Sequence, residues 1–105
     1  MKEEQTMKKV YFTVTGTRHY YGQSFIEAGM TVSLVKDKEN EHDREAIQVE
    51  LPGLGKIGYV ANSPYTVRGE SYSAGRLYDK FKKKAQGTVR YVLNDALLCT
   101  IWIKG

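Results

Sequence analysis

The chain of 105 residues contains one cysteine, two prolines and no long apolar run. A single cysteine cannot form an intramolecular disulfide, and structural zinc sites usually use at least two cysteines, so both stabilising devices of small secreted domains are missing. No stretch approaches the about 20 apolar residues of a membrane-spanning helix, and residues 1–9 lack the apolar region of a signal peptide. We therefore expect one domain, without membrane association, in the reducing cytoplasm.

Motifs of catalysis are missing as well. The sequence has no Gly-x-Ser-x-Gly elbow for a nucleophilic serine and no Gly-x-x-x-x-Gly-Lys-Ser/Thr loop for a nucleotide. His19, His42, Asp43 and Cys99 are residue types that bind metals, but their spacings do not place two ligands on one turn or helix face. We therefore expect a binding module rather than an enzyme, with no metal or other cofactor.

Positive charge and aromatic residues are both plentiful. The formal net charge is +4, the pI is about 9.2, and the chain has eight Tyr, three Phe and one Trp. Cationic side chains neutralise phosphates and aromatic faces stack on exposed bases, so this composition is compatible with a nucleic-acid partner. Part of the charge lies in the run Lys80, Lys82, Lys83 and Lys84, which is more typical of the solvated end of a helix than of a nucleic-acid contact.

Apolar periodicity predicts a mainly β fold with one helix. Six strands are predicted over residues 9–15, 31–36, 46–51, 57–60, 88–93 and 97–103, and the helix over 72–84. Residues 1–8 have no periodicity and are expected to form a mobile tail, which leaves residues 9–105 as the domain. Short connections without a βαβ repeat favour a small six-stranded antiparallel barrel, closed or nearly closed and OB-like or SH3-like.

Several connections carry specific expectations. Residues 17–29 form a long, Tyr-rich connection, and the polar residues 37–45 must turn the chain between two strands. Asn94 and Asp95 tolerate the left-handed conformations of a tight hairpin turn. Ser71 or Ser73 is available to cap the helix. Gly16, Gly22 and Gly58 fit backbone roles such as bulges and close approach, rather than ligand contacts.

Three blocks in a fixed order carry a family resemblance. They are residues 12–22 (FTVTGTRHYYG), 38–49 (KENEHDREAIQV) and 55–60 (GKIGYV). Together they resemble the HIRAN domain, whose pattern has a strand ending in Gly, a Tyr-rich loop, an Asn-x-x-Asp-x-x-Ala-Ile segment and an Ile-Gly-Tyr strand. The match covers residues 9–103, and the chain is similar to the free-standing bacterial members of the family.

The resemblance implies an OB-like barrel that binds single-stranded DNA and captures free 3′ ends, in DNA repair or replication stress and beside other repair proteins. A strand end offers an unstacked base, a hydroxyl and phosphates, so its reader needs flat rings, an acceptor and cations. The site residues that the resemblance implies are Arg18, His19, Tyr20 and Tyr21 in the Tyr-rich loop and Asn40, His42 and Asp43 in the acidic block. Tyr59 is a further candidate, although its neighbours Ile57 and Val60 favour a core position over a base contact.

In that family pattern Asp43 accepts the terminal 3′ hydroxyl and Asn40 hydrogen-bonds nearby. His19 and His42 replace the two tyrosines that sandwich the last base. Histidine rings cover less area and titrate near neutral pH, so stacking should be weaker and pH-dependent. Asn62 stands where some relatives have a basic residue, which removes one phosphate contact.

Two alternatives stay open at the level of the sequence. Asp43 also fits an Asx turn, its carboxylate capping backbone N–H groups between two strands. The whole domain also fits an SH3-like module that binds peptides in an aromatic groove, and only phosphate-driven binding should weaken steeply with salt. The sequence leaves open the choice between DNA and RNA, the protein partners and self-association.

Overall fold

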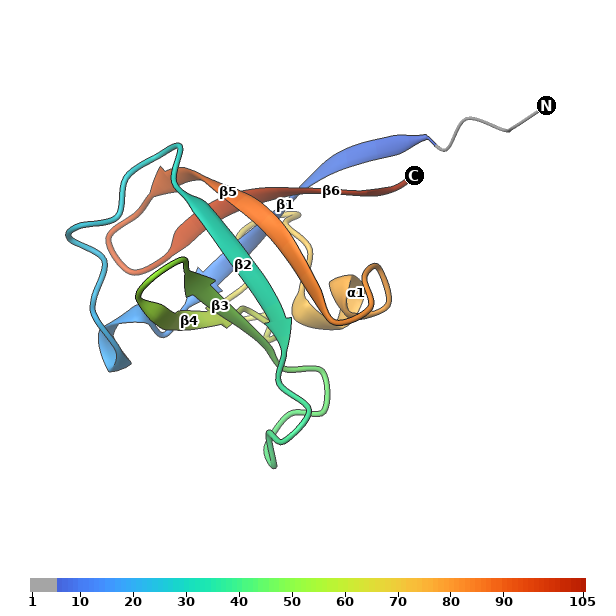
Figure 1. Cartoon of the computed structure of the whole chain (residues 1–105), viewed down its shortest axis with the longest axis horizontal. Helices are drawn as coiled ribbons and strands as arrows, with labels where there is room; N and C mark the ends of the chain where they lie inside the picture. The colour runs from blue at the N-terminus through green and yellow to red at the C-terminus, as the bar shows by residue number, and fades with distance from the viewer. Residues whose placement is uncertain (1–5) are drawn as a thin grey trace.

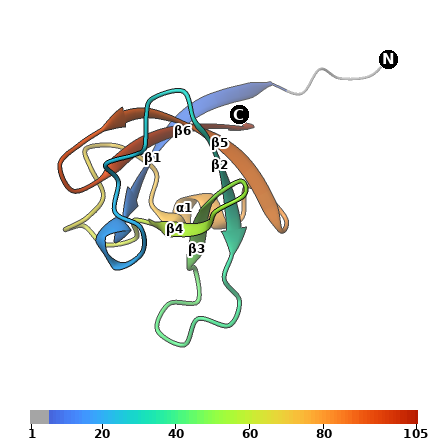
Figure 2. The same ribbon diagram turned by 60° about the vertical axis from the view of Figure 1, so that its left-hand side comes forward.

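The computed structural model describes residues 6–105, which form a closed antiparallel barrel (Figures 1 and 2). Around the barrel the strand order is β1-β4-β3-β2-β5-β6. The elements are β1 (Met7–Thr15), the 3-10 helix η1 (Thr17–His19), β2 (Thr31–Lys36), β3 (Ile47–Leu51), β4 (Gly55–Val60), α1 (Ala74–Tyr78), β5 (Lys84–Val92) and β6 (Leu97–Lys104). The predicted fold, a small six-stranded barrel with one helix, is confirmed.

The core lies inside the barrel and follows from the period of two along each strand. In β1, Phe12 and Val14 are fully buried whereas Tyr11 points outward and is exposed. The largest fully buried side chains come from five strands and the helix: Phe12, Leu34, Ile47, Ile57, Leu77 and Leu97. Cys99 is also fully buried on the core face of β6, as its alternation with Leu97 and Ile101 predicts.

The first strand begins earlier than predicted. Met7 and Lys8, which the sequence placed in the tail, pair with Lys104 and Ile103 of β6. The long β1–β6 ladder supplies backbone partners for these residues, so side-chain periodicity is not needed to hold them in a strand. Residues 1–5 of the expected tail lie outside the described residues.

The predicted helix over 72–84 is much too long. The α-helix covers only Ala74–Tyr78 and is capped by Ser73, whose hydroxyl accepts a hydrogen bond from the backbone N–H of Arg76 (3.2 Å). The apolar positions of the pattern do pack against the core, but the chain then enters β5, where Lys84 pairs with Val35 of β2. Backbone pairing between distant strands therefore overrides the helical pattern.

The turns match expectation in place but not in every conformation. Residues 37–45 connect β2 and β3, and the β3–β4 hairpin closes with Leu51 opposite Gly55. In the β5–β6 turn the Leu93 N–H donates to the Ala96 carbonyl (2.9 Å). The left-handed conformation expected there is wrong, because no non-glycine residue among 6–105 has a positive φ. A loop of this length uses an ordinary turn instead. Within residues 6–105 no helix is long and apolar enough to cross a membrane.

Candidate nucleic-acid interface

The acidic connection between β2 and β3 is held by two successive Asx turns. The side-chain oxygen of Asn40 accepts hydrogen bonds from the backbone N–H groups of His42 and Asp43, both at 2.9 Å. One carboxylate oxygen of Asp43, Oδ1, accepts from the N–H of Glu45 (2.9 Å). The Asx turn considered for Asp43 is therefore present, and it occupies one of the two oxygens.

Asp43 also lines a shallow pocket of about 370 Å³, which we call the loop pocket. Oδ2 accepts a hydrogen bond from the side-chain amide of Asn62 (3.1 Å). Asn62 in turn accepts from the N–H of Gly75 in α1 (2.9 Å), so it links the helix to the acidic loop. The pocket is lined by Asn40, His42, Asp43, Ala46, Tyr59, Val60, Asn62, Ser63 and Thr66. Four of the eight predicted site residues thus meet in one concavity.

Tyr59 lies on the outside of β4, half-buried, and not in the core. Its hydroxyl donates to the carboxylate of Asp37 (2.7 Å) and accepts from the ammonium of Lys56 (3.2 Å). The ring of Tyr20 lies 6.5 Å from that of Tyr59, tilted by 46°. The Lys56 nitrogen is 5.1 Å from the centre of the Tyr20 ring and 5.0 Å from that of Tyr59, within the range of cation–π contacts. A cation and two aromatic rings therefore lie beside the acidic loop.

The hydrogen bond to Tyr59 raises the pKa of Lys56 above its ordinary value. Burial, and the hydrogen bond to Asp37, raise the pKa of Tyr59. Both shifts keep the pair as ammonium and neutral phenol at physiological pH.

Lys56 is not among the predicted site residues, although it is one of the cations that stand beside glycine or aromatic residues in the sequence. Residues three apart in a regular strand point to opposite faces, so Lys56 and Tyr59 should not meet. The β3–β4 ladder shifts register here, with Val49 opposite Gly58 but Glu50 opposite Lys56. This β-bulge turns Lys56 to the side of Tyr59. Only the adjacent glycines of the hairpin hinted at such an irregularity.

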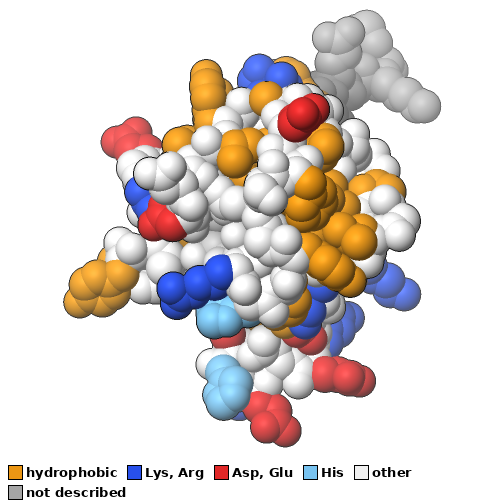
Figure 3. Space-filling view, turned by 90° about the vertical axis from the view of Figure 1, so that its left-hand side faces the viewer, with side chains coloured by type: hydrophobic (Ala, Val, Ile, Leu, Met, Phe, Trp, Pro, Cys, Tyr) orange, Lys and Arg blue, Asp and Glu red, His pale blue; other side chains and the backbone are white. Residues whose placement is uncertain are grey.

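The Tyr-rich loop lies beside β4, but none of its residues lines the loop pocket. Arg18 and His19 are exposed in η1, and they line a different pocket, of about 380 Å³, with Asn94 and Asp95. Tyr21 is also exposed and follows η1. The two histidines at the presumed stacking positions therefore line different pockets, although both are visible on one face of the molecule (Figure 3).

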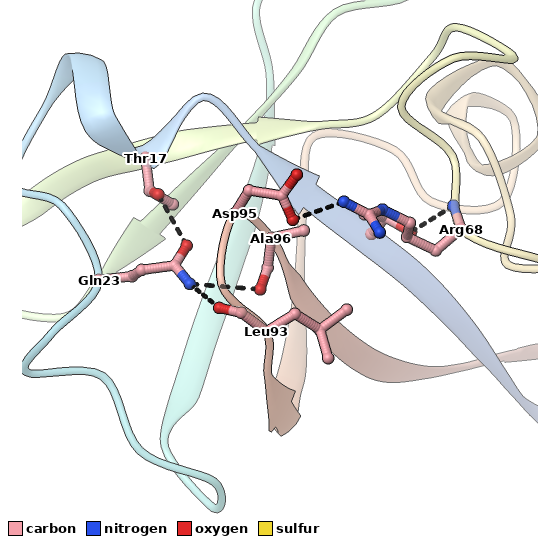
Figure 4. Close-up of polar contacts among 7 residues, drawn as sticks. Thr17, Gln23, Arg68, Leu93, Asp95 and Ala96 are labelled. Atoms are coloured by element: carbon pink, nitrogen blue, oxygen red, sulfur yellow. Dashed lines mark hydrogen bonds and ion pairs between the residues drawn. The ribbon is translucent and has the colours of Figure 1, made fainter.

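Gln23 fixes this loop to the rest of the barrel (Figure 4). Its side-chain oxygen accepts from the hydroxyl of Thr17 (2.8 Å), and its amide donates to the carbonyls of Leu93 and Ala96 in the β5–β6 turn. Polar residues in long loops rarely reveal their partners in a sequence, and Gln23 was not foreseen.

Glycines allow the close approach that brings η1 to β4. A Cβ atom on Gly58 would lie 2.7 Å from the carbonyl oxygen of Thr15, so a larger residue would push β1 away from β4. Gly16 (φ +79°) and Gly22 (φ +70°) have left-handed backbone conformations before and after the Tyr-rich turn. All three glycines have the backbone roles expected of them.

The family model of the HIRAN domain matches residues 7–104, nearly the whole chain. The chain belongs to the HIRAN domain family. Membership indicates a nucleic-acid-binding module. HIRAN is a family of binding domains that are not catalytic by themselves.

A crystal structure of a protein from Lactobacillus plantarum is similar to this HIRAN domain, with a TM-score of 0.58 and 24% sequence identity over 93% of this chain and 99% of the other. At this identity the likeness supports the barrel fold alone. No curated protein matches the chain significantly. Among residues 6–105 no group of three or more His, Cys, Asp or Glu side chains is arranged to hold a metal ion.

Proposed function

We propose that this HIRAN domain binds single-stranded DNA and receives a free 3′ end in the loop pocket, in the context of DNA repair or replication stress. The observation that supports the proposal is the meeting of the Asp43 carboxylate, the His42 imidazole and the Tyr59 phenol in one concavity. These groups supply an acceptor for a hydroxyl and planar rings for a base.

The acidic surroundings favour a hydroxyl end in particular. Asp37, Glu39, Glu41 and Glu45 lie in or beside the same loop and repel phosphates. An ionised carboxylate oxygen accepts more than one hydrogen bond, so Oδ2 of Asp43 can hold the Asn62 amide and the 3′ hydroxyl of a deoxyribose together. A 3′ phosphate in the same place would bring two negative groups together. Lys56, beside the rings of Tyr20 and Tyr59, is a cation that can contact a phosphate further along the strand.

The test is fluorescence anisotropy with a labelled single strand at about 50 mM salt, where phosphate contacts are little screened. Three ligands are compared: a strand with a 3′ hydroxyl, the same strand with a 3′ phosphate, and a blunt duplex. We expect the wild-type domain to prefer the 3′ hydroxyl. Asp43→Asn retains an oxygen for the Glu45 N–H but removes the charge, and should abolish that preference.

Glu41→Gln is the matched control, because it removes one negative charge from an exposed position of the same loop. We expect this variant to keep the preference for the hydroxyl. If no strand binds to the wild-type domain, the nucleic-acid function is wrong, and an aromatic peptide-binding groove becomes the next hypothesis to screen. If strands bind without any preference for the 3′ hydroxyl, end capture alone is wrong.

A further inference from the structure

A second surface, away from the loop pocket, combines exposed rings with cations. Across the β1–β6 ladder Lys9 is opposite Trp102 and Tyr11 is opposite Thr100, and across β5–β6 Tyr91 is opposite Leu98. Paired residues of an antiparallel ladder point to the same side, and Tyr11 is on the outer side of its strand. Arg90 joins them because its guanidinium donates to the Thr100 hydroxyl (3.0 Å). We call Lys9, Tyr11, Arg90, Tyr91 and Trp102 the aromatic face.

The rings of this face are open to solvent. Trp102 is 60% exposed, Tyr91 56% and Tyr11 39%. The Tyr11 and Tyr91 rings are nearly parallel, at 18° with 6.5 Å between their centres. The Lys9 nitrogen lies 5.9 Å from the centre of the Trp102 ring. Exposed aromatic side chains gathered on one side of a sheet are typical of a binding surface.

The charge around the rings is predominantly positive. Beside Lys9 and Arg90, the nearby Tyr72 has the Arg76 guanidinium 3.7 Å and the Lys8 ammonium 5.8 Å from the centre of its ring. Lys8 beside Tyr72 also lowers the pKa of that phenol. The cations of this region are Lys8, Lys9, Arg68, Arg76 and Arg90, and the acids are Glu70 and Asp95, of which Asp95 pairs with Arg68.

Grooves connect this face to the loop pocket. A mostly apolar groove of about 460 Å³ contains Tyr11 and Tyr91 on one side and Tyr72 on the other. A neighbouring groove of about 720 Å³ shares Tyr72 with the first, and it shares Asn62 and Ser63 with the loop pocket. The three hollows therefore adjoin one another through shared residues, and they lead from the loop pocket toward Tyr11 and Tyr91 of the aromatic face.

We propose that the aromatic face binds the body of a single-stranded nucleic acid, with bases stacked on Tyr91 and Trp102 and phosphates on Lys9 and Arg90. Alternating rings and cations complement a chain of unpaired bases and phosphates, because stacking needs no particular base and the charges are opposite. The inference rests on the nucleic-acid function proposed above and assigns the strand a second contact surface, separate from the one that receives its end.

The test uses a closed circular single-stranded DNA, which has no end for the loop pocket to capture. We expect the wild-type domain to bind this circle at about 50 mM salt. Tyr91→Ala and Trp102→Ala should each weaken binding about tenfold, as expected for the loss of one stacking ring. Tyr65→Ala is the matched control, because Tyr65 is 95% exposed but lies outside the aromatic face, and it should leave the affinity unchanged.

A second measurement tests the cations of the aromatic face through the salt dependence of the affinity. In the variant with Lys9→Ala and Arg90→Ala, the slope of log affinity against log salt should become shallower by about 1.4, because each phosphate contact to a single strand contributes about 0.7. Lys82→Ala, at an exposed position off the face, is the control and should leave the slope unchanged. The proposal is overturned if the wild-type domain does not bind the circle, or if the ring variants bind it as tightly as Tyr65→Ala. Neither result affects the preference for a linear 3′ hydroxyl, which tests the loop pocket separately.

Discussion

At Asp43 the two oxygens of one carboxylate have different surroundings. Oδ1 accepts a hydrogen bond from the Glu45 N–H of its own loop, whereas Oδ2 accepts one from the side-chain amide of Asn62, another residue that lines the loop pocket. A structural and a ligand-binding role are therefore compatible at this residue. The sequence could not separate them, because both use the same Asn-x-x-Asp spacing, and only the position of Asn62 some 20 residues later shows which way the second oxygen points.

Arg68 is held by an acid at the edge of the aromatic face. Its guanidinium and the Asp95 carboxylate are 2.5 Å apart, and both side chains are exposed. Exposed ion pairs contribute little to stability, so Asp95→Asn should leave the free energy of unfolding within about 0.5 kcal/mol of the wild type. Freed from its partner, Arg68 can contact a phosphate, and we expect severalfold tighter binding of circular single-stranded DNA at low salt, measured by anisotropy.

The variant with Arg68→Ala as well as Asp95→Asn is the control for this prediction. We expect the double variant to lose the added affinity, because it has no Arg68 guanidinium to contact a phosphate. A gain that came only from removing the repelling Asp95 carboxylate would persist in the double variant. Equal gains in the single and double variants would show that Arg68 does not contact the strand.

Among the elements, the Tyr-rich connection is tied to the β5–β6 turn by the hydrogen bonds of one side chain. The Gln23 side chain forms hydrogen bonds with the hydroxyl of Thr17 at the start of the connection and with two backbone carbonyls in the β5–β6 turn. Gln23→Ala removes these bonds and should lower the free energy of unfolding by about 1–2 kcal/mol, measured by urea denaturation. The backbone N–H groups of His19, Tyr20 and Gly22, which bond within the connection, should exchange faster with solvent.

The control is Gln86→Ala, which removes the same side chain from an exposed position in β5. It should leave both the unfolding free energy and the exchange of the three N–H groups close to the wild type. If Gln23→Ala leaves the exchange of the three N–H groups unchanged, the hydrogen bonds of Gln23 do not hold the loop, and its backbone and the buried Ile26 suffice.

The elements that follow a local pattern were predictable, and those set by distant pairing were not. Alternation located the strands, and Gly53 and Gly55 marked the hairpin whose left-handed positions they occupy. The helix was overestimated because the pairing of Lys84 and Ala85 with β2 begins where the helical pattern continues. The bulge that brings Lys56 to Tyr59 is equally a property of two strands together.

For the whole molecule, closure of the barrel explains why the core could be predicted from the sequence and why the aromatic face could not. The core could be predicted because each strand turns its apolar side inward. The aromatic face could not, since Tyr11, Tyr91 and Trp102 come from three strands and meet only through the register of β1, β6 and β5. In the sequence each of these rings is an isolated outward residue, of the kind that needs no explanation. The family resemblance instead named four residues that line the loop pocket, Asn40, His42, Asp43 and Tyr59, because they lie within two short motifs.

Closure also isolates the only thiol of the chain. Cys99 is fully buried on the inner side of β6, and burial raises its pKa to about 12. Since the thiolate is the reactive form, the folded protein should react very slowly with a thiol reagent even at pH 9, whereas the urea-unfolded chain should react at once. If β6 opens only with the whole barrel, the labelling rate in increasing urea should follow global unfolding measured by circular dichroism. Labelling that is rapid without urea would instead show that β6 separates locally from β1, and the aromatic face would then be a transient surface rather than a fixed one.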